Sequence, residues 1–97
     1  MGGLENNLDY IDSEFKNLDQ EITYTRNLVN VYKELINLVL RAEDISKEST
    51  QKELIEYQNS KIDTMVLQKK LIREKEFLLY KKRILIAEND YQILSLY

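Results

Sequence analysis

Carboxylates are the most numerous groups in this sequence that could do acid–base or metal chemistry. The chain has 17 Asp and Glu residues but no Cys and no His, so it lacks thiol nucleophiles, imidazole bases and the usual zinc ligands. Close pairs such as Glu5 with Asp9, or Glu43 with Asp44, could only act as acid–base pairs or bind hard cations. No glycine-rich phosphate loop and no His-containing metal motif accompanies them. We interpret these pairs as solvated helix surface, and we expect no enzymatic activity and no cofactor.

Basic residues form a second group with potential function, between residues 69 and 83. Seven Lys and Arg residues stand there against Glu74 and Glu76, a net charge of +5. Such a patch could bind nucleic acid or anionic lipid. Residues 5–21 offer another partner, because they carry six carboxylates against Lys16 alone, a net charge of −5. We interpret the two blocks as partners of each other and do not expect nucleic-acid binding.

Long helices with few turns must carry these groups. The 97 residues include no Pro, and the only glycines are Gly2 and Gly3, whereas folds with many turns use both residues where the chain reverses. Steps of four and three residues from Leu4 meet eleven seam positions, of which ten are apolar: Leu4, Leu8, Ile11, Phe15, Leu18, Ile22, Thr25, Val29, Tyr32, Ile36 and Val39. This heptad pattern predicts a coiled-coil helix. A second stripe widens its later half: Tyr24, Leu28, Val31, Leu35, Leu38 and Ala42.

A polar segment from Glu43 to Glu53 interrupts the seam, with Ile45 as its one apolar residue. We predict a single all-α helical hairpin over residues 1–97, with helix one at about 4–42, a turn at about 43–49 and helix two at about 50–96. Thr50 and Glu53 have the spacing of a capping box, and Ser46 and Ser49 are alternative caps. Two alternatives stay open: a turn at Asn59–Ser60, and straight helices of two chains paired antiparallel with a stagger.

Charge favours the hairpin. Folding the chain about residue 46 places residue i beside residue 92 − i, so the acidic arm lies along the basic arm. Flanking charges of opposite sign set the orientation of helices in coiled coils. The predicted pairing residues are Asp9, Asp12, Glu14 and Asp19 in the first arm, and Lys69, Lys70, Arg73, Lys81, Lys82 and Arg83 in the second.

The last part of the chain, FLLYKKRILIAENDYQILSLY, carries more apolar residues than one seam requires. Four consecutive helical residues sweep most of the circumference, and one partner helix covers about a third of it. We therefore expect a second copy to cover the rest, giving a homodimeric four-helix bundle. The predicted interface consists of Leu28, Leu35, Leu38, Phe77, Leu79, Tyr80, Ile86, Tyr91, Ile93 and Leu94, and Tyr57, Tyr80, Tyr91 and Tyr97 are candidate anchors.

Short segments resemble hairpins of bacterial export systems. Residues 44–48, DISKE, look like the tip of the α-hairpin in periplasmic adaptor proteins of efflux and type I secretion pumps. Residues 57–63, YQNSKID, with Asn89, Asp90 and Tyr91 resemble a helix turn of TolC-like channels, although Ser60 stands where that family has Gly. The length and mid-chain turn are similar to small secreted Trp-x-Gly hairpin proteins, although the chain has no Trp.

The sequence thus predicts a non-catalytic coiled-coil hairpin that associates with itself and serves as an interaction or assembly module. The first alternative, implied by the resemblances, is a hairpin component of a secretion or efflux assembly. The second is a nucleic-acid-binding helical dimer. No run approaches the length of about 18 apolar residues that a membrane span needs, and the sequence leaves the cellular compartment open.

Overall fold

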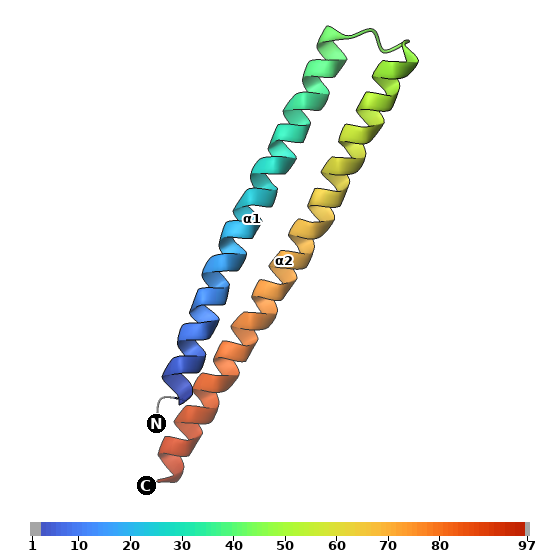
Figure 1. Cartoon of the computed structure of the whole chain (residues 1–97). Helices are drawn as coiled ribbons and strands as arrows, with labels where there is room; N and C mark the ends of the chain where they lie inside the picture. The colour runs from blue at the N-terminus through green and yellow to red at the C-terminus, as the bar shows by residue number, and fades with distance from the viewer. Residues whose placement is uncertain (1–2, 97) are drawn as a thin grey trace.

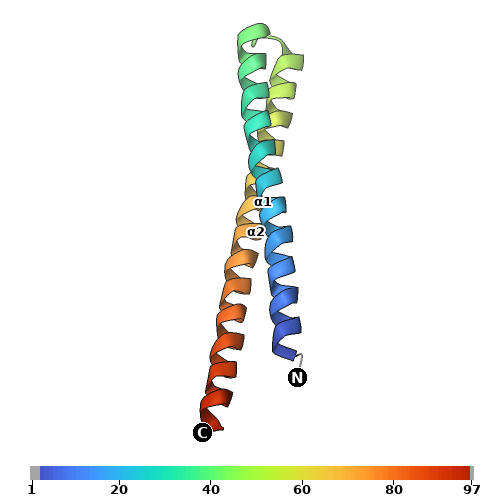
Figure 2. The same cartoon turned by 90° about the vertical axis from the view of Figure 1, so that its left-hand side faces the viewer.

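The computed structural model describes residues 3–96 as two long antiparallel helices, α1 (Gly3–Ala42) and α2 (Glu48–Ser95). The helices lie side by side, with the connector at one end and both termini at the other (Figure 1). They cross at a shallow angle, which Figure 2 shows. The molecule measures 77 × 14 × 14 Å, and no strand occurs among the described residues. The predicted all-α helical hairpin is confirmed.

The seam predicted for the first helix is the contact face of α1. All eleven seam positions are buried or half-buried, and we call them the inner seam of α1. The buried residues of α1 all belong to it: Ile11, Leu18, Ile22, Thr25, Val29, Ile36 and Val39. Thr25 is only 1% exposed. Its Oγ1 donates a hydrogen bond of 2.8 Å to the carbonyl oxygen of Ile22, which satisfies this buried hydroxyl in a largely apolar row.

The facing side of α2 follows the same spacing but is much more polar. We define the inner seam of α2 as its buried or half-buried positions with alternating steps of four and three: Thr50, Leu54, Tyr57, Lys61, Thr64, Gln68, Leu71, Lys75, Leu78, Lys82, Leu85 and Asn89. Only Thr50 and Leu71 are fully buried in α2. A cluster of buried apolar residues joins Leu71 to Leu18 and Ile22 of α1, with Leu78 packed against it.

The connector, residues 43–47, is closed by bonds that cross it. Thr50 is 3% exposed, and its Oγ1 lies 3.3 Å from Oε2 of Glu43. Gln51 Nε2 donates to the carbonyl oxygen of Ile45 over 3.0 Å. The N-cap of α2 is Lys47, and no side chain caps it. The capping-box prediction is therefore wrong: Thr50 reaches back across the turn, and α2 begins at Glu48.

The register differs slightly from the predicted one. The two ion pairs that join the helices, Asp12–Lys82 and Asp19–Lys75, place residue i beside residue 94 − i, where the sequence predicted 92 − i. This register corresponds to a fold centred at residue 47, one residue later than the predicted centre at residue 46. The alternative turn at Asn59–Ser60 is wrong, because both residues lie within α2.

Asp44 organises the connector. Its Oδ1 accepts hydrogen bonds from the backbone N–H of Ser46 over 3.0 Å and from the Ser46 hydroxyl over 2.7 Å. Both bonds lower the pKa of Asp44 below its usual 3.8, because they stabilise the ionised carboxylate, and the bond from the Ser46 hydroxyl has the larger effect. The carboxylate therefore stabilises the folded turn above pH 3.8, and this contribution is lost as the pH falls through the lowered pKa.

Replacing Asp44 by Asn tests this charge. Asn keeps an acceptor oxygen but cannot ionise, so we expect the Asp44→Asn variant to have a lower melting temperature than the native chain at neutral pH. The difference in melting temperature, followed by circular dichroism, should shrink as the pH falls well below 3.8. A difference that is constant over this range would contradict the role of the ionised carboxylate.

Leu71 is the one fully buried apolar residue of α2, at 6% exposure. Truncating a buried Leu to Ala removes apolar contacts and leaves a cavity. We expect Leu71→Ala to lower the free energy of unfolding by about 2 kcal/mol or more, measured by urea denaturation at fixed protein concentration. Leu67→Ala is the matched control, because Leu67 lies one turn away and is exposed. Equal losses for the two variants would contradict the proposed core.

Candidate interaction surface

Two lysines of the inner seam of α2 form ion pairs with carboxylates of α1. Lys82 Nζ lies 2.9 Å from Asp12 Oδ1, and Lys75 pairs with Asp19. All four side chains keep a large part of their surface in water, so each pair contributes less than about 1 kcal/mol to stability. Their main effect is on geometry, because the two pairs, one heptad apart, favour this antiparallel register over a slipped one.

Other basic residues lie over aromatic rings rather than beside carboxylates. Lys81 Nζ lies 5.5 Å from the centre of the Phe77 ring, and Arg83 Cζ lies 5.6 Å from that of Tyr80. Lys82 also lies 6.0 Å from the ring of Phe15. These are the distances of cation–π contacts. Lys81 and Arg83 therefore accompany the exposed rings of α2 along its surface.

The predicted pairing residues do not all pair. Asp12, Asp19 and Lys82 form ion pairs, and so does Lys75, which belongs to the basic block but was not among the predicted residues. Asp9 and Lys69 are exposed, and no ion pair between residues 3 and 96 includes them. Of the remaining members, Glu14, Lys70, Arg73 and Lys81 line a shallow groove between the helices, and Arg83 lies over the Tyr80 ring.

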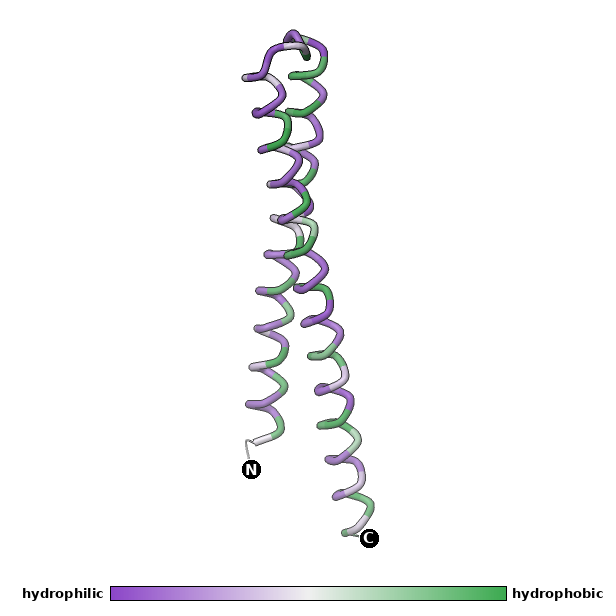
Figure 3. The backbone as a smooth tube through the Cα atoms, turned by 90° about the vertical axis from the view of Figure 1, so that its right-hand side faces the viewer, coloured by the Kyte–Doolittle hydropathy of each residue, from purple (hydrophilic) through white to green (hydrophobic). Residues whose placement is uncertain are grey.

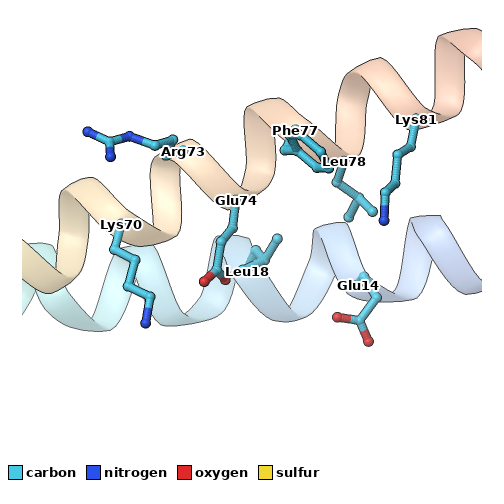
Figure 4. Close-up of a pocket in the computed structure, with 8 residues that line it drawn as sticks. All are labelled: Glu14, Leu18, Lys70, Arg73, Glu74, Phe77, Leu78 and Lys81. Atoms are coloured by element: carbon cyan, nitrogen blue, oxygen red, sulfur yellow. The ribbon is translucent and has the colours of Figure 1, made fainter.

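That groove has a volume of about 420 Å³. Leu18 of α1 and Leu78 of α2 point into the space between the helices, whereas Arg73 points away from it (Figure 4). Phe77 forms one edge. Ile84, with Tyr10 and Lys81, borders an adjoining hollow of about 310 Å³ towards the free ends of the helices. Apolar surface is thus accessible along one side of the contact between the helices.

From Phe77 to the end of α2, the most exposed large apolar residues belong to one regular row. Its members are spaced by alternating steps of three and four residues: Phe77, Tyr80, Ile84, Ala87, Tyr91 and Leu94. We call this the outer row of α2. Its large side chains are 56–73% exposed, because the row lies mainly on the side of α2 that faces away from α1. Figure 3 shows apolar residues on several sides of the last turns of α2.

A third row lies between the outer row and the inner seam of α2. Leu79, Ile86 and Ile93 recur at intervals of seven residues and are 39–46% exposed, which is less than the outer row because α1 is nearer. On α1, the predicted second stripe is partly covered. Leu28 and Leu35 are half-buried at the edge of the inner seam, and Leu38 is largely exposed.

The candidate tyrosine anchors fall into different environments. Tyr80 and Tyr91 belong to the outer row and are exposed. Tyr57 lies in the inner seam of α2, where its hydroxyl donates to Glu53 Oε1 over 2.8 Å. This bond to a carboxylate, with some desolvation, raises the pKa of Tyr57 above its usual value. Tyr97 lies outside the described residues. Ile45, at the connector, is half-exposed.

Sequence reasoning missed Ile84 and Ala87 as members of the outer row. The signal was present, because both positions continue the step pattern of Phe77 and Tyr80 at helical spacing. It was obscured by the neighbouring Leu85 and Ile86, which make the segment apolar on every side. Only the position of α1 shows which of these residues face it.

The hairpin leaves much surface in water. Its accessible area is 7809 Å², whereas a compact monomer of 11.6 kDa would expose about 5,800 Å². Among residues 3–96, no cluster of carboxylates has the geometry of a metal site. Neither helix, over the same residues, combines the length and the apolar character of a membrane span.

Comparison of the chain with protein-family models, with curated proteins and with solved structures finds no match.

The Asp12–Lys82 pair can be tested by exchanging its charges. We expect Lys82→Glu and Asp12→Lys each to lower the free energy of unfolding by roughly 0.5 kcal/mol at low salt, because each places like charges across the helices. The double variant should recover most of the loss. Lys69→Glu, in the same basic block but outside the two pairs, is the control. Urea denaturation that shows additive losses in the double variant would contradict the pairing.

Proposed function

We propose that this protein is a non-catalytic helical hairpin that associates with itself and serves as an assembly or interaction module. The outer row of α2 carries the proposal. Aromatic and aliphatic side chains that are more than half exposed recur there at coiled-coil spacing from Phe77 to Leu94, and a monomer rarely leaves so large an apolar patch in water.

The modest core of the hairpin supports the same proposal. The inner seam of α2 contributes few apolar side chains, and a thin seam between two helices gives little hydrophobic stabilisation. Burial of further apolar surface adds about 25 cal/mol per Å². Self-association would therefore stabilise the helices that it joins.

The contacts of the basic residues favour this function over nucleic-acid binding. Lys75 and Lys82 face carboxylates of α1, and Lys81 and Arg83 lie over rings of their own helix. A nucleic-acid surface instead requires cations that are free to reach successive phosphates. The geometry gives the secretion and efflux alternative no comparable support.

Light scattering tests the proposal. At tens of micromolar we expect a mass of twice 11.6 kDa, and the double variant Phe77→Ser, Tyr91→Ser should return to the mass of one chain while staying helical. The matched control is Ile55→Ser, Ile62→Ser, because these apolar residues of α2 are also more than half exposed but lie outside the outer row. A native chain that is monomeric at this concentration would refute the proposal.

A further inference from the structure

We infer that the partner of the outer row of α2 is the same row of a second copy, running antiparallel about a two-fold axis near residues 85 and 86. This inference rests on the proposed self-association and specifies its interface. The arrangement differs from a four-helix bundle along the whole hairpin, because only the last third of each α2 would overlap.

The spacing of the row fits this symmetry. In an antiparallel coiled coil, an a position of one helix lies opposite a d position of the other. The outer row has steps of three, four, three, four and three residues, and this order is the same in either direction along the helix. Phe77 then lies opposite Leu94, Tyr80 opposite Tyr91, and Ile84 opposite Ala87. The outer layers therefore pair Phe with Leu and Tyr with Tyr, and the central layer places the smallest residue of the row, Ala87, beside Ile84.

Charges on both flanks of the row are complementary in this arrangement. On one flank, Lys81 lies opposite Glu88 of the second copy, and on the other, Arg83 lies opposite Asp90. By symmetry each pair occurs twice. All four residues are exposed or half-buried at most in the hairpin, so they are available to a partner. Flanking charges of this kind set orientation in coiled coils.

Lys70 and Arg73 decide between the antiparallel and the parallel arrangement. A parallel, in-register pair would also satisfy its flanks, with Glu76 beside Lys81 and Arg83 beside Glu88. The row continues backwards, however, through Arg73 and Lys70 at the same spacing. A parallel pair would place each of these cations against its own copy in the seam. An antiparallel pair separates the two copies of Arg73 by about 37 Å along the axis.

The available area is sufficient for a weak, specific dimer. Phe77, Tyr80 and Tyr91 expose about two-thirds of side chains that bury roughly 150–250 Å² each. With Ile84 and Leu94, the two copies together offer on the order of 1,000 Å², which is the lower limit of specific interfaces. We therefore expect the dimer to form in the micromolar range.

Reversal of two charges distinguishes the arrangements. Lys81→Glu and Glu88→Lys should each weaken dimerisation roughly tenfold at low salt, measured by sedimentation equilibrium. In the antiparallel dimer the double variant regains near-native affinity, because the two exchanged side chains again face each other with opposite charge. In a parallel dimer it is weaker than either single variant. Lys69→Glu is the control, and circular dichroism shows that each variant stays helical.

Crosslinking provides an independent test, because the native chain has no Cys. A mixture of Tyr80→Cys and Tyr91→Cys chains should form only the mixed disulfide under mild oxidation. Disulfides between identical chains, or a double charge variant that does not recover, would overturn the antiparallel pairing. If the native chain dimerises but none of these charge changes alters the affinity, the outer row is not the interface, although self-association stands. A monomeric native chain would overturn both.

Discussion

The hairpin depends on an uneven contact between its two helices. The inner seam of α1 is apolar at ten of its eleven positions, whereas the facing seam of α2 includes Lys61, Gln68, Lys75, Lys82 and Asn89. Each helix still has the heptad spacing that keeps its seam towards the other. The apolar residues of α2 that would have completed a symmetric core lie elsewhere on its circumference, and the surplus surface of the molecule is a direct consequence.

Lys75 and Lys82 in the inner seam of α2 combine two roles. Both residues are half-buried in the seam while their ammonium groups reach carboxylates of α1 at its edge, as long cationic side chains commonly do. Lys82 reaches Asp12 and also lies near the Phe15 ring. Polar groups at seam positions cost stability but restrict register and orientation. A two-helix contact with few other constraints gains a defined alignment from Lys75 and Lys82.

Sequence reasoning could predict the parts of the fold that follow from a strong period. The seam from Leu4 to Val39 is regular enough to identify the contact face of α1. The start of α2 was harder, because no Gly or Pro marks the turn and because Thr50 bonds to Glu43 across it instead of capping the helix. The inner seam of α2 could not be predicted, since half of it is polar and the neighbouring rows are more apolar. Which apolar rows of α2 stay exposed to water depends on which row forms the inner seam.

The basic block of α2 acts differently at different positions around one helix. Lys75 and Lys82 turn towards α1 and its carboxylates. Lys70 and Arg73, at positions that continue the outer row, end its apolar run at Phe77. In the proposed dimer, the same excess of positive charge therefore aligns the hairpin internally and limits pairing of α2 with a second α2 to its last turns. A block of uniform sign gives this result only because a helix distributes neighbouring residues around its axis. The net charge of +5 that first indicated a single electrostatic partner thus divides into cations that pair with carboxylates of α1 and cations that, in the proposed dimer, would disfavour a parallel second copy.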